Sequence, residues 1–105
     1  MSSKRKFTVN SKETSINGTS QKGQVYTTYD KLVNVLGQPK SGSADGKTTC
    51  EWHVEFEDGE VVTIYDWKVP ETPKHLYKWN VGARNHTPLD YLETLLETRV
   101  VSTNF

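Results

Sequence analysis

The sequence predicts an α+β fold, in which two amphipathic helices cover one face of an antiparallel sheet of about five strands. Three observations predict it. Residues 50–68 alternate apolar and polar side chains around an Asp-Gly turn, as a β-hairpin does. Residues 29–36 and 87–100 instead repeat apolar side chains every three or four positions, as helices do. The predicted order of elements is β-β-α-β-β-β-α.

The hairpin is the centre of the predicted sheet. A loop of two residues at the Asp-Gly turn, or of four, sets Trp52 opposite Tyr65. Side chains alternate between the faces of a strand. The predicted core face therefore carries Cys50, Trp52, Val54, Phe56, Val61, Tyr65 and Trp67. The predicted polar face carries Glu51, His53, Glu55, Val62, Ile64 and Asp66.

The remaining strands are shorter. Residues 6–10 alternate weakly, which predicts an edge strand. Residues 24–28 are rich in Val, Tyr and Thr, and residues 75–82 alternate aromatic and polar side chains, so each predicts a further strand. The segments 11–23 and 40–47 carry Gly, Ser, Thr and Asn, which is typical of loops.

The ends of both helices have recognisable signals. Thr28 is expected to cap the first helix, and Gly37 is expected to close it in the left-handed conformation. Thr87 followed by Pro88 predicts the start of the second helix. The apolar stripe of that helix is formed by Leu89, Leu92, Leu95, Leu96 and Val100.

Length and charge limit the possible functions. The 105 residues suit a single domain, 1–105, with frayed ends at 1–5 and 102–105. Thirteen basic and thirteen acidic residues give no net charge, which argues against duplex nucleic acid as a partner. No apolar run is long enough for a membrane span, and no secretory segment follows the first residue. We therefore expect a cytoplasmic protein.

The sequence carries few signals of catalysis. The three histidines have no metal-ligand spacing, so we expect neither a metal nor a cofactor. His53 between Glu51 and Glu55 is interpreted as solvated. Glu51 and Asp66 face each other in the predicted register and could form an acid–base pair. Neutralisation by nearby lysines is the preferred interpretation, and Cys50 is expected to be a core residue.

Three groups of residues are more typical of ligand binding. Arg84, His86 and Thr87 lie at a helix start, where free N–H groups and the helix dipole favour an anion. The alternative is an ordinary capped loop. Trp67 and Trp79 could stack on a base, with Lys68 beside a phosphate, although both rings also suit a core. Residues 17–21, which include Thr19 and Ser20, offer hydroxyls and amides for a sugar or base edge, or simply form a turn.

Several segments together resemble a known family. The pattern TSxxG…YxxLVxxxGxP…WxxxFxDGxVxTIYxWK is present between Thr19 and Lys68, and the likeness extends over residues 7–98. It is similar to that of small phage-encoded proteins that bind cyclic dinucleotide signals and so blunt a host anti-phage pathway of the CBASS type. The resemblance implies that the matched site residues are Thr19, Ser20, Trp67, Lys68 and Trp79. The chain departs from the family pattern at residues 83–85.

The sequence therefore predicts a non-enzymatic protein that sequesters a cyclic dinucleotide or related nucleotide in the host cytoplasm. A dimer with shared sites is plausible, because so small a chain offers little concave surface. Two other functions stay open. The first is a protein-binding inhibitor of a host factor, which would add a strand or helix face to its target. The second is a small phosphodiesterase, against which the absence of paired histidines weighs.

Overall fold

Seven strands form one antiparallel sheet in the computed structural model, which describes residues 6–103. The α+β class and the two helices are as predicted, but the sheet has seven strands rather than five. In chain order the elements are β1 (Phe7–Val9), β2 (Ser20–Thr27), α1 (Tyr29–Leu36), β3 (Lys40–Ser41), β4 (Cys50–Phe56), β5 (Val61–Tyr65), β6 (Tyr77–Ala83), α2 (Thr87–Leu96) and β7 (Val100–Ser102).

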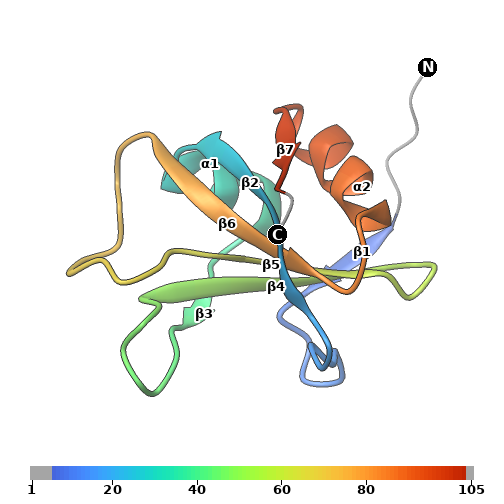
Figure 1. The fold of residues 1–105 in the computed structure, drawn as a ribbon, viewed down its shortest axis with the longest axis horizontal. Coiled ribbons are helices and arrows are strands. Elements are labelled where there is room, and N and C mark those ends of the chain that lie inside the picture. Colours follow the sequence, from blue (N-terminus) through green and yellow to red (C-terminus); the bar gives the residue numbers. More distant parts are fainter. Residues whose placement is uncertain (1–5, 104–105) are drawn as a thin grey trace.

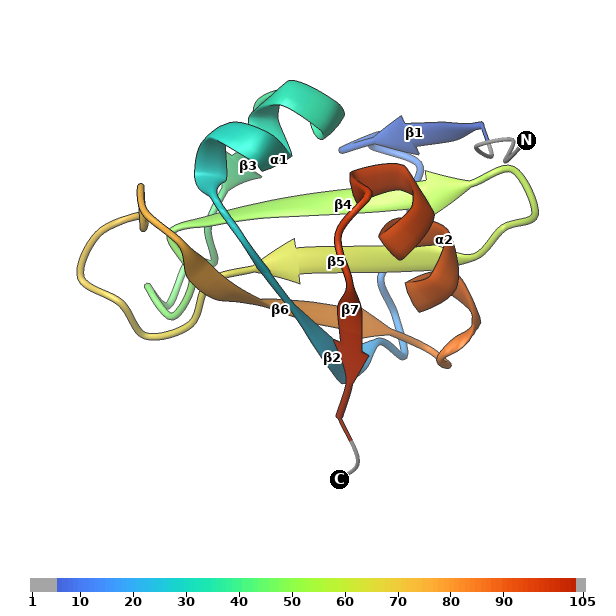
Figure 2. The ribbon, with the colours of Figure 1, turned by 90° about the horizontal axis from the view of Figure 1, so that it is seen from above.

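The strands are arranged in the order β1-β4-β5-β6-β2-β7, and β3 pairs with β4 off this path. β1 is an edge strand, as predicted. The strands missing from the prediction, β3 and β7, are only two and three residues long, too short to show an alternating pattern. Figure 2 shows β2 and β7 crossing the direction of β4 and β5 steeply, so the sheet is strongly twisted.

The end of α2 corrects the predicted second helix. Glu97 takes the left-handed conformation, with φ of 54°, and ends the helix. The chain then reverses, and Val100 pairs with Val25 of β2 instead of extending the helical stripe. Ser102, expected to fray, pairs with Gly23. The other predicted frayed residues, 1–5 and 104–105, lie outside the described part of the chain, and Thr103 N donates a hydrogen bond to Lys22 O.

The turn between β4 and β5 differs from the predicted one by a single residue. Its loop contains three residues, because Phe56 N donates to Glu60 O at 2.8 Å. Gly59 supplies the positive φ, 88°, that such a loop requires. A loop of two or four residues would place Trp52 opposite Tyr65, whereas a loop of three shifts the pairing of β5 by one residue. Trp52 consequently lies opposite Ile64.

This shift exchanges the two faces of β5. The predicted core face of β4 is confirmed, but Val62 and Ile64 are the β5 residues that join it in the core. Tyr65, predicted to be core, lies on the opposite face beside Trp67. Val61 is also on that face, and it is buried there.

The core lies between the sheet and both helices, which cover the same face (Figure 1). Trp52 and Trp79 are fully buried and pack edge to face with ring centres 5.5 Å apart. Each indole also donates a hydrogen bond, Trp52 to Gly37 O and Trp79 to Thr27 O, so neither buried N–H is unpaired. The helices contribute Leu32, Leu36, Leu89, Leu92, Leu95 and Leu96 to this cluster.

The helix starts confirm one prediction and correct another. Thr28 caps α1, because its side chain accepts a hydrogen bond from Lys31 N. Gly37 ends α1 as predicted, with φ of 89°, but its ψ of −170° is not that of the left-handed helix. Thr87 is the first residue of α2 rather than its cap. The side chain of Asn85 accepts the hydrogen bond from Thr87 N instead.

Candidate functional site

The sheet face opposite the helices has a cavity between two loops. The loops, residues 10–19 and 42–49, project on the lower side of the sheet in Figure 1. The cavity has a volume of about 240 Å³. Its walls and floor are formed by Ile16, Thr19, Ser20, Ser43, Asp45, Thr48, Glu51, Thr63, Tyr65, Trp67 and Gly82. Five of these residues carry hydroxyls on Ser or Thr, so the cavity is rich in hydrogen-bonding groups.

A glycine on β6 leaves room for the cavity floor. Gly82 lies opposite Thr63 of β5. A Cβ at Gly82 would lie 2.5 Å from Thr63 Oγ1, a distance that real Cβ atoms essentially never show. Residues with larger side chains would therefore fill the depression or displace Thr63.

Local hydrogen bonds fix the loop of residues 42–49. Ser43 N donates to Thr48 Oγ1 at 2.7 Å, and Thr48 N donates back to Ser43 Oγ at 3.2 Å. Asp45 accepts hydrogen bonds from Ser43 Oγ and Lys47 N, and these bonds lower its pKa below the ordinary value. The loop is therefore held with its hydroxyls and one carboxylate at the cavity.

Arg84 fixes the other loop. Its guanidinium donates hydrogen bonds of 2.8 Å to Asn17 O and to Ser15 O. Thr19 Oγ1 donates to Ile16 O at 2.8 Å and closes the end of the loop before β2. Arginine bridging two carbonyls in this way positions the loop against β6.

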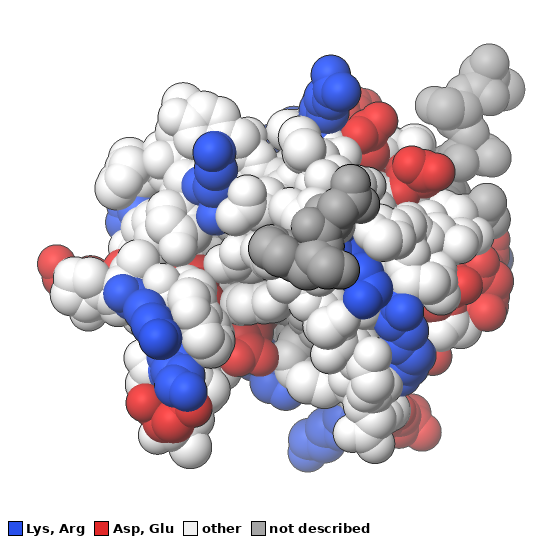
Figure 3. Space-filling view, viewed as in Figure 1, with Lys and Arg blue, Asp and Glu red and all other residues white. Residues whose placement is uncertain are grey.

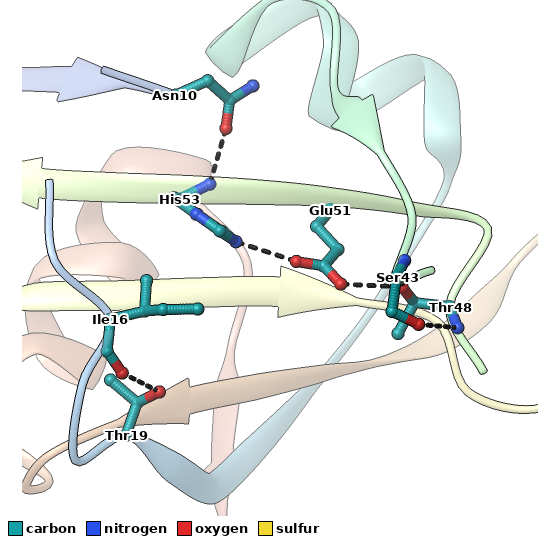
Figure 4. A network of polar contacts seen from close by, with 7 residues as sticks. All are labelled: Asn10, Ile16, Thr19, Ser43, Thr48, Glu51 and His53. Atoms are coloured by element: carbon teal, nitrogen blue, oxygen red, sulfur yellow. Dashed lines mark hydrogen bonds and ion pairs between the residues drawn. The ribbon is translucent and has the colours of Figure 1, made fainter. Parts of the chain in front are cut away.

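A polar network runs beneath the cavity, as Figure 4 shows. Glu51 Oε1 lies 2.8 Å from His53 Nε2, and Glu51 Oε2 accepts a 2.7 Å hydrogen bond from Thr48 Oγ1. The hydrogen bond from His53, and then that from Thr48, lower the pKa of Glu51 against the opposing effect of burial. The backbone N–H of His53 donates to Asn10 Oδ1. The network fixes Glu51 as a carboxylate under the cavity.

Two aromatic rings separate this cavity from a second one. Tyr65 and Trp67 line both, and the second, also about 240 Å³, is completed by Gln21 and Asn80. The rings pack edge to face with centres 6.3 Å apart. Burial, and secondarily Glu51, raise the pKa of Tyr65, so its hydroxyl stays a donor at neutral pH. The amides form a further polar group, because Gln21 Nε2 donates to Asn80 Oδ1 at 2.7 Å.

Two lysines flank the ring of Trp67. The indole is 45% exposed. Lys47 Nζ lies 5.8 Å and Lys68 Nζ 5.7 Å from a ring centre of Trp67, within the range of cation–π contact. Lys68 N donates to Lys47 O at 2.7 Å, which ties this segment to the loop of residues 42–49. Lys47 Nζ also lies 3.9 Å from Asp45 Oδ2, so the exposed aromatic surface lies beside the charge of Lys68 and the Lys47–Asp45 ion pair.

The structure brings together only part of the predicted site. Thr19, Ser20 and Trp67 line the cavity, and Lys68 lies against Trp67. Trp79 is a core residue with no exposed surface. Arg84 is engaged by the loop carbonyls. His86 and Thr87, by contrast, are exposed at the start of α2, the helix that packs on the other face of the sheet.

Two further expectations are wrong. His53 is buried and bonded to Glu51 rather than solvated. Asp66 does not face Glu51, because Glu51 pairs with Tyr65. The carboxylate of Asp66 is fully buried and accepts hydrogen bonds from Thr49 N at 2.7 Å and from the Thr49 hydroxyl. The predicted Glu51–Asp66 pair therefore does not form.

Sequence reasoning missed several residues of this face. The incorrect register puts Tyr65 in the core, and Lys47 and Asn80 have no motif of their own. The available signal was the alternation of residues 77–83: it already put Asn80 on the face opposite Trp79. A correct hairpin loop would have added Tyr65 to the face that already carried Glu51 and Asn80.

Comparisons with protein-family models, with curated proteins and with solved structures find no match for the chain. Within residues 6–103, no three His, Cys, Asp or Glu side chains are grouped to hold a metal ion. No helix in the described part of the chain has the length and apolar character needed to cross a membrane. The fold and site define a small α+β protein with an open, loop-flanked sheet face.

Proposed function

We propose that the protein binds a cyclic dinucleotide or a related nucleotide at the cavity face and sequesters it without turnover. One observation carries the proposal: the exposed ring of Trp67 lines two cavities and has beside it the ammonium group of Lys68 and that of Lys47, which is paired with Asp45. A nucleotide needs both features. Its base stacks on an aromatic ring, and its phosphate pairs with a nearby cation.

The shape of the face favours a ligand with two parts. Each cavity is smaller than the range of about 300–1,000 Å³ that is usual for drug-sized ligands. The two share Tyr65 and Trp67 as a common wall. A dinucleotide could place one base on each side of this wall, and the hydroxyls and amides of both cavities would bind its sugars and base edges.

The charge distribution agrees with a small anion rather than a long polyanion. Basic and acidic groups are interspersed on the face seen in Figure 3, and the chain has no net charge. The positive charges at Lys47 and Lys68 are local to Trp67. A local pair of cations suits one or two phosphates, whereas duplex nucleic acid requires an extended basic surface. The proposed place of action is the cytoplasm of an infected host cell.

Mass spectrometry of the bound ligand tests this function. Protein is purified from cells that produce a cyclic dinucleotide, and the heated sample is analysed for released nucleotide. Sequestration predicts the intact cyclic form. A parallel incubation with excess protein, with and without magnesium or manganese, should return the cyclic dinucleotide unchanged. A linear product that grows with time, and that is absent from a boiled-protein control, would contradict the proposal.

Hydrolysis is a second candidate that one observation favours. His53 and Glu51 form a bonded pair beneath the cavity, and such a pair can transfer protons. The linear product described above would identify the protein as a phosphodiesterase. Glu51→Gln would then abolish the formation of product while leaving ligand binding measurable.

A protein-binding inhibitor is a third candidate. Tyr26, Leu76 and Val101 are more than half exposed and offer apolar contacts. No nucleotide released from the purified protein, together with unchanged cyclic dinucleotide in the incubation, would favour this function over both others.

A further inference from the structure

We propose that Glu51 selects the base of the ligand and favours guanine, whose edge presents two adjacent N–H donors. This inference rests on the proposed nucleotide-binding function and concerns the cavity beneath Trp67. The side chain of Glu51 is 19% exposed and lines that cavity. Glu51 and Thr48 are the members of the His53–Glu51–Thr48 network that line the cavity.

The chemistry of the carboxylate determines what it accepts. An ionised carboxylate has about four lone-pair positions and donates no hydrogen bond. His53 Nε2 occupies a position on Oε1, and Thr48 Oγ1 occupies one on Oε2. Each oxygen therefore keeps capacity for one further donor. Two adjacent N–H groups on one base edge match this arrangement, as they do when a carboxylate pairs with guanine.

The same network prevents the carboxylate from turning away. One oxygen is held from the β4 strand by His53, and the other is held from the loop by Thr48 (Figure 4). Thr48 Oγ1 donates to Glu51, and the pairing with His53 Nε2 also lowers the pKa of Glu51, so the carboxylate keeps its charge. A fixed acceptor costs less ordering free energy on binding than a mobile one.

Charge also sets the orientation of the ligand. Glu51 accepts donors at the cavity, whereas the second carboxylate there, Asp45, lies 3.9 Å from Lys47 Nζ and is paired with it. Lys68 lies beside Trp67 and is not among the residues that line the cavity. The base consequently enters the cavity while a phosphate lies at Lys68. Adenine offers only one amino group next to a ring acceptor, and that acceptor would face a carboxylate oxygen.

The experiment is a calorimetric comparison of cyclic di-GMP with cyclic di-AMP. Wild-type protein is expected to bind cyclic di-GMP more tightly by roughly ten- to a hundredfold, the discrimination of one good bidentate pair. Glu51→Gln keeps the size of the side chain but replaces one acceptor with a donor. It should remove most of this preference by weakening cyclic di-GMP binding, with cyclic di-AMP affinity nearly unchanged.

Glu55→Gln is the matched control. Glu55 is on the same face of β4 and accepts a hydrogen bond from a threonine, Thr14 Oγ1, but it lines a different cavity. The preference for cyclic di-GMP should survive in this variant. Retained binding of cyclic di-AMP by Glu51→Gln shows that the variant is folded.

Three results would overturn the inference. Equal wild-type affinities for the two ligands, or a preference for cyclic di-AMP, would contradict it and leave the binding function intact. A cyclic di-GMP preference that Glu51→Gln does not change would assign selection to another residue. No binding of either ligand to the wild type would overturn both the inference and the proposed function.

Discussion

The two faces of the sheet differ in what covers them and in what their side chains do. The helix-covered face is apolar, and its tryptophans have all of their surface buried. The loop-covered face carries hydroxyls, amides, the His53–Glu51 pair and a tryptophan that is 45% exposed. Adjacent residues of β4 and β5 contribute to both faces, so one short hairpin supports the core on one side and the cavity on the other.

The difference depends on the register of one turn. The three-residue loop at Gly59 places Ile64 in the core and Tyr65 at the cavity. A loop shorter or longer by one residue would exchange them. Substitutions on the two faces should consequently affect different properties. Those on the core face mainly lower the free energy of unfolding, and those on the cavity face mainly lower the affinity for the ligand.

The largest effect is expected for Trp52→Ala. Trp52 is fully buried, packs on Tyr29 and Trp79, and donates a hydrogen bond to Gly37 O. Removing it should lower the free energy of unfolding by about 3–5 kcal/mol. Trp67→Ala on the other face should lower it by only about 0.5–1.5 kcal/mol, because the half-exposed Trp67 loses mainly its edge-to-face contact with Tyr65. Urea unfolding of both variants measures the contrast, and similar losses for the two would mean that the faces are not distinct.

A smaller effect is expected for Arg84→Ala. Its two hydrogen bonds to Asn17 O and Ser15 O hold the loop at the cavity. Their loss should destabilise the loop by about 1–2 kcal/mol. Amide hydrogen exchange at Thr19, whose N–H donates to Ile16 O, measures this locally. Arg99→Ala, at the other end of α2, is the control; equally slow exchange in both variants would show that Arg84 does not hold the loop.

The pH dependence of stability should reveal the network beneath the cavity. Hydrogen bonds from His53 and Thr48 lower the pKa of Glu51 in the folded state from its ordinary 4.5. Protonation therefore favours the unfolded chain. The contribution of Glu51 is complete above 4.5 and is lost as the pH falls through the lower folded-state pKa. Unfolding free energies measured across this range should fall less steeply for Glu51→Gln than for the wild type, and parallel curves would count against the network.

The smallest predicted effect concerns the ionisation and reactivity of the Cys50 thiol. Burial, and then the charge of Asp66, raise the pKa of its thiol to about 11. Little thiolate forms at neutral pH, so an alkylating reagent should react with the folded protein far more slowly than with protein in denaturant. The thiolate favours the unfolded chain, so the stability contribution of the protonated thiol is lost as the pH rises from its ordinary pKa of 9 toward 11. Rapid labelling of the folded protein would place Cys50 outside the core.

The elements could be predicted from the sequence because their signals are local. The stripe that begins at Tyr29 and the Thr28 cap define α1 within a single stretch of chain. The strand carrying Trp79 shows its alternation over seven residues. Short strands carry no such signal. β7 forms because the chain reverses at Glu97 and because β2 offers an edge with which it can pair. Both conditions depend on the tertiary fold rather than on the local sequence.

The site was less predictable, because it depends on which face each residue takes and on how loops fold back. Thr19 and Trp67 were identified individually, but their common cavity requires Arg84 to hold one loop and Thr48 to hold the other. The predicted anion site at Thr87 was derived from a helix start alone. The structure puts that helix start on a different part of the molecule from the cavity face.

The most direct test of the central claim is the affinity of a cyclic dinucleotide for the wild type and for Trp67→Ala, measured by titration calorimetry. Tyr26→Ala is the matched control, because Tyr26 is 57% exposed on β2 and lines neither cavity. Loss of one stacked base should cost about 1–3 kcal/mol, or roughly five- to 150-fold in affinity, in Trp67→Ala only. Unchanged affinity in Trp67→Ala, or an equal loss in Tyr26→Ala, would show that the cavity face is not the nucleotide site.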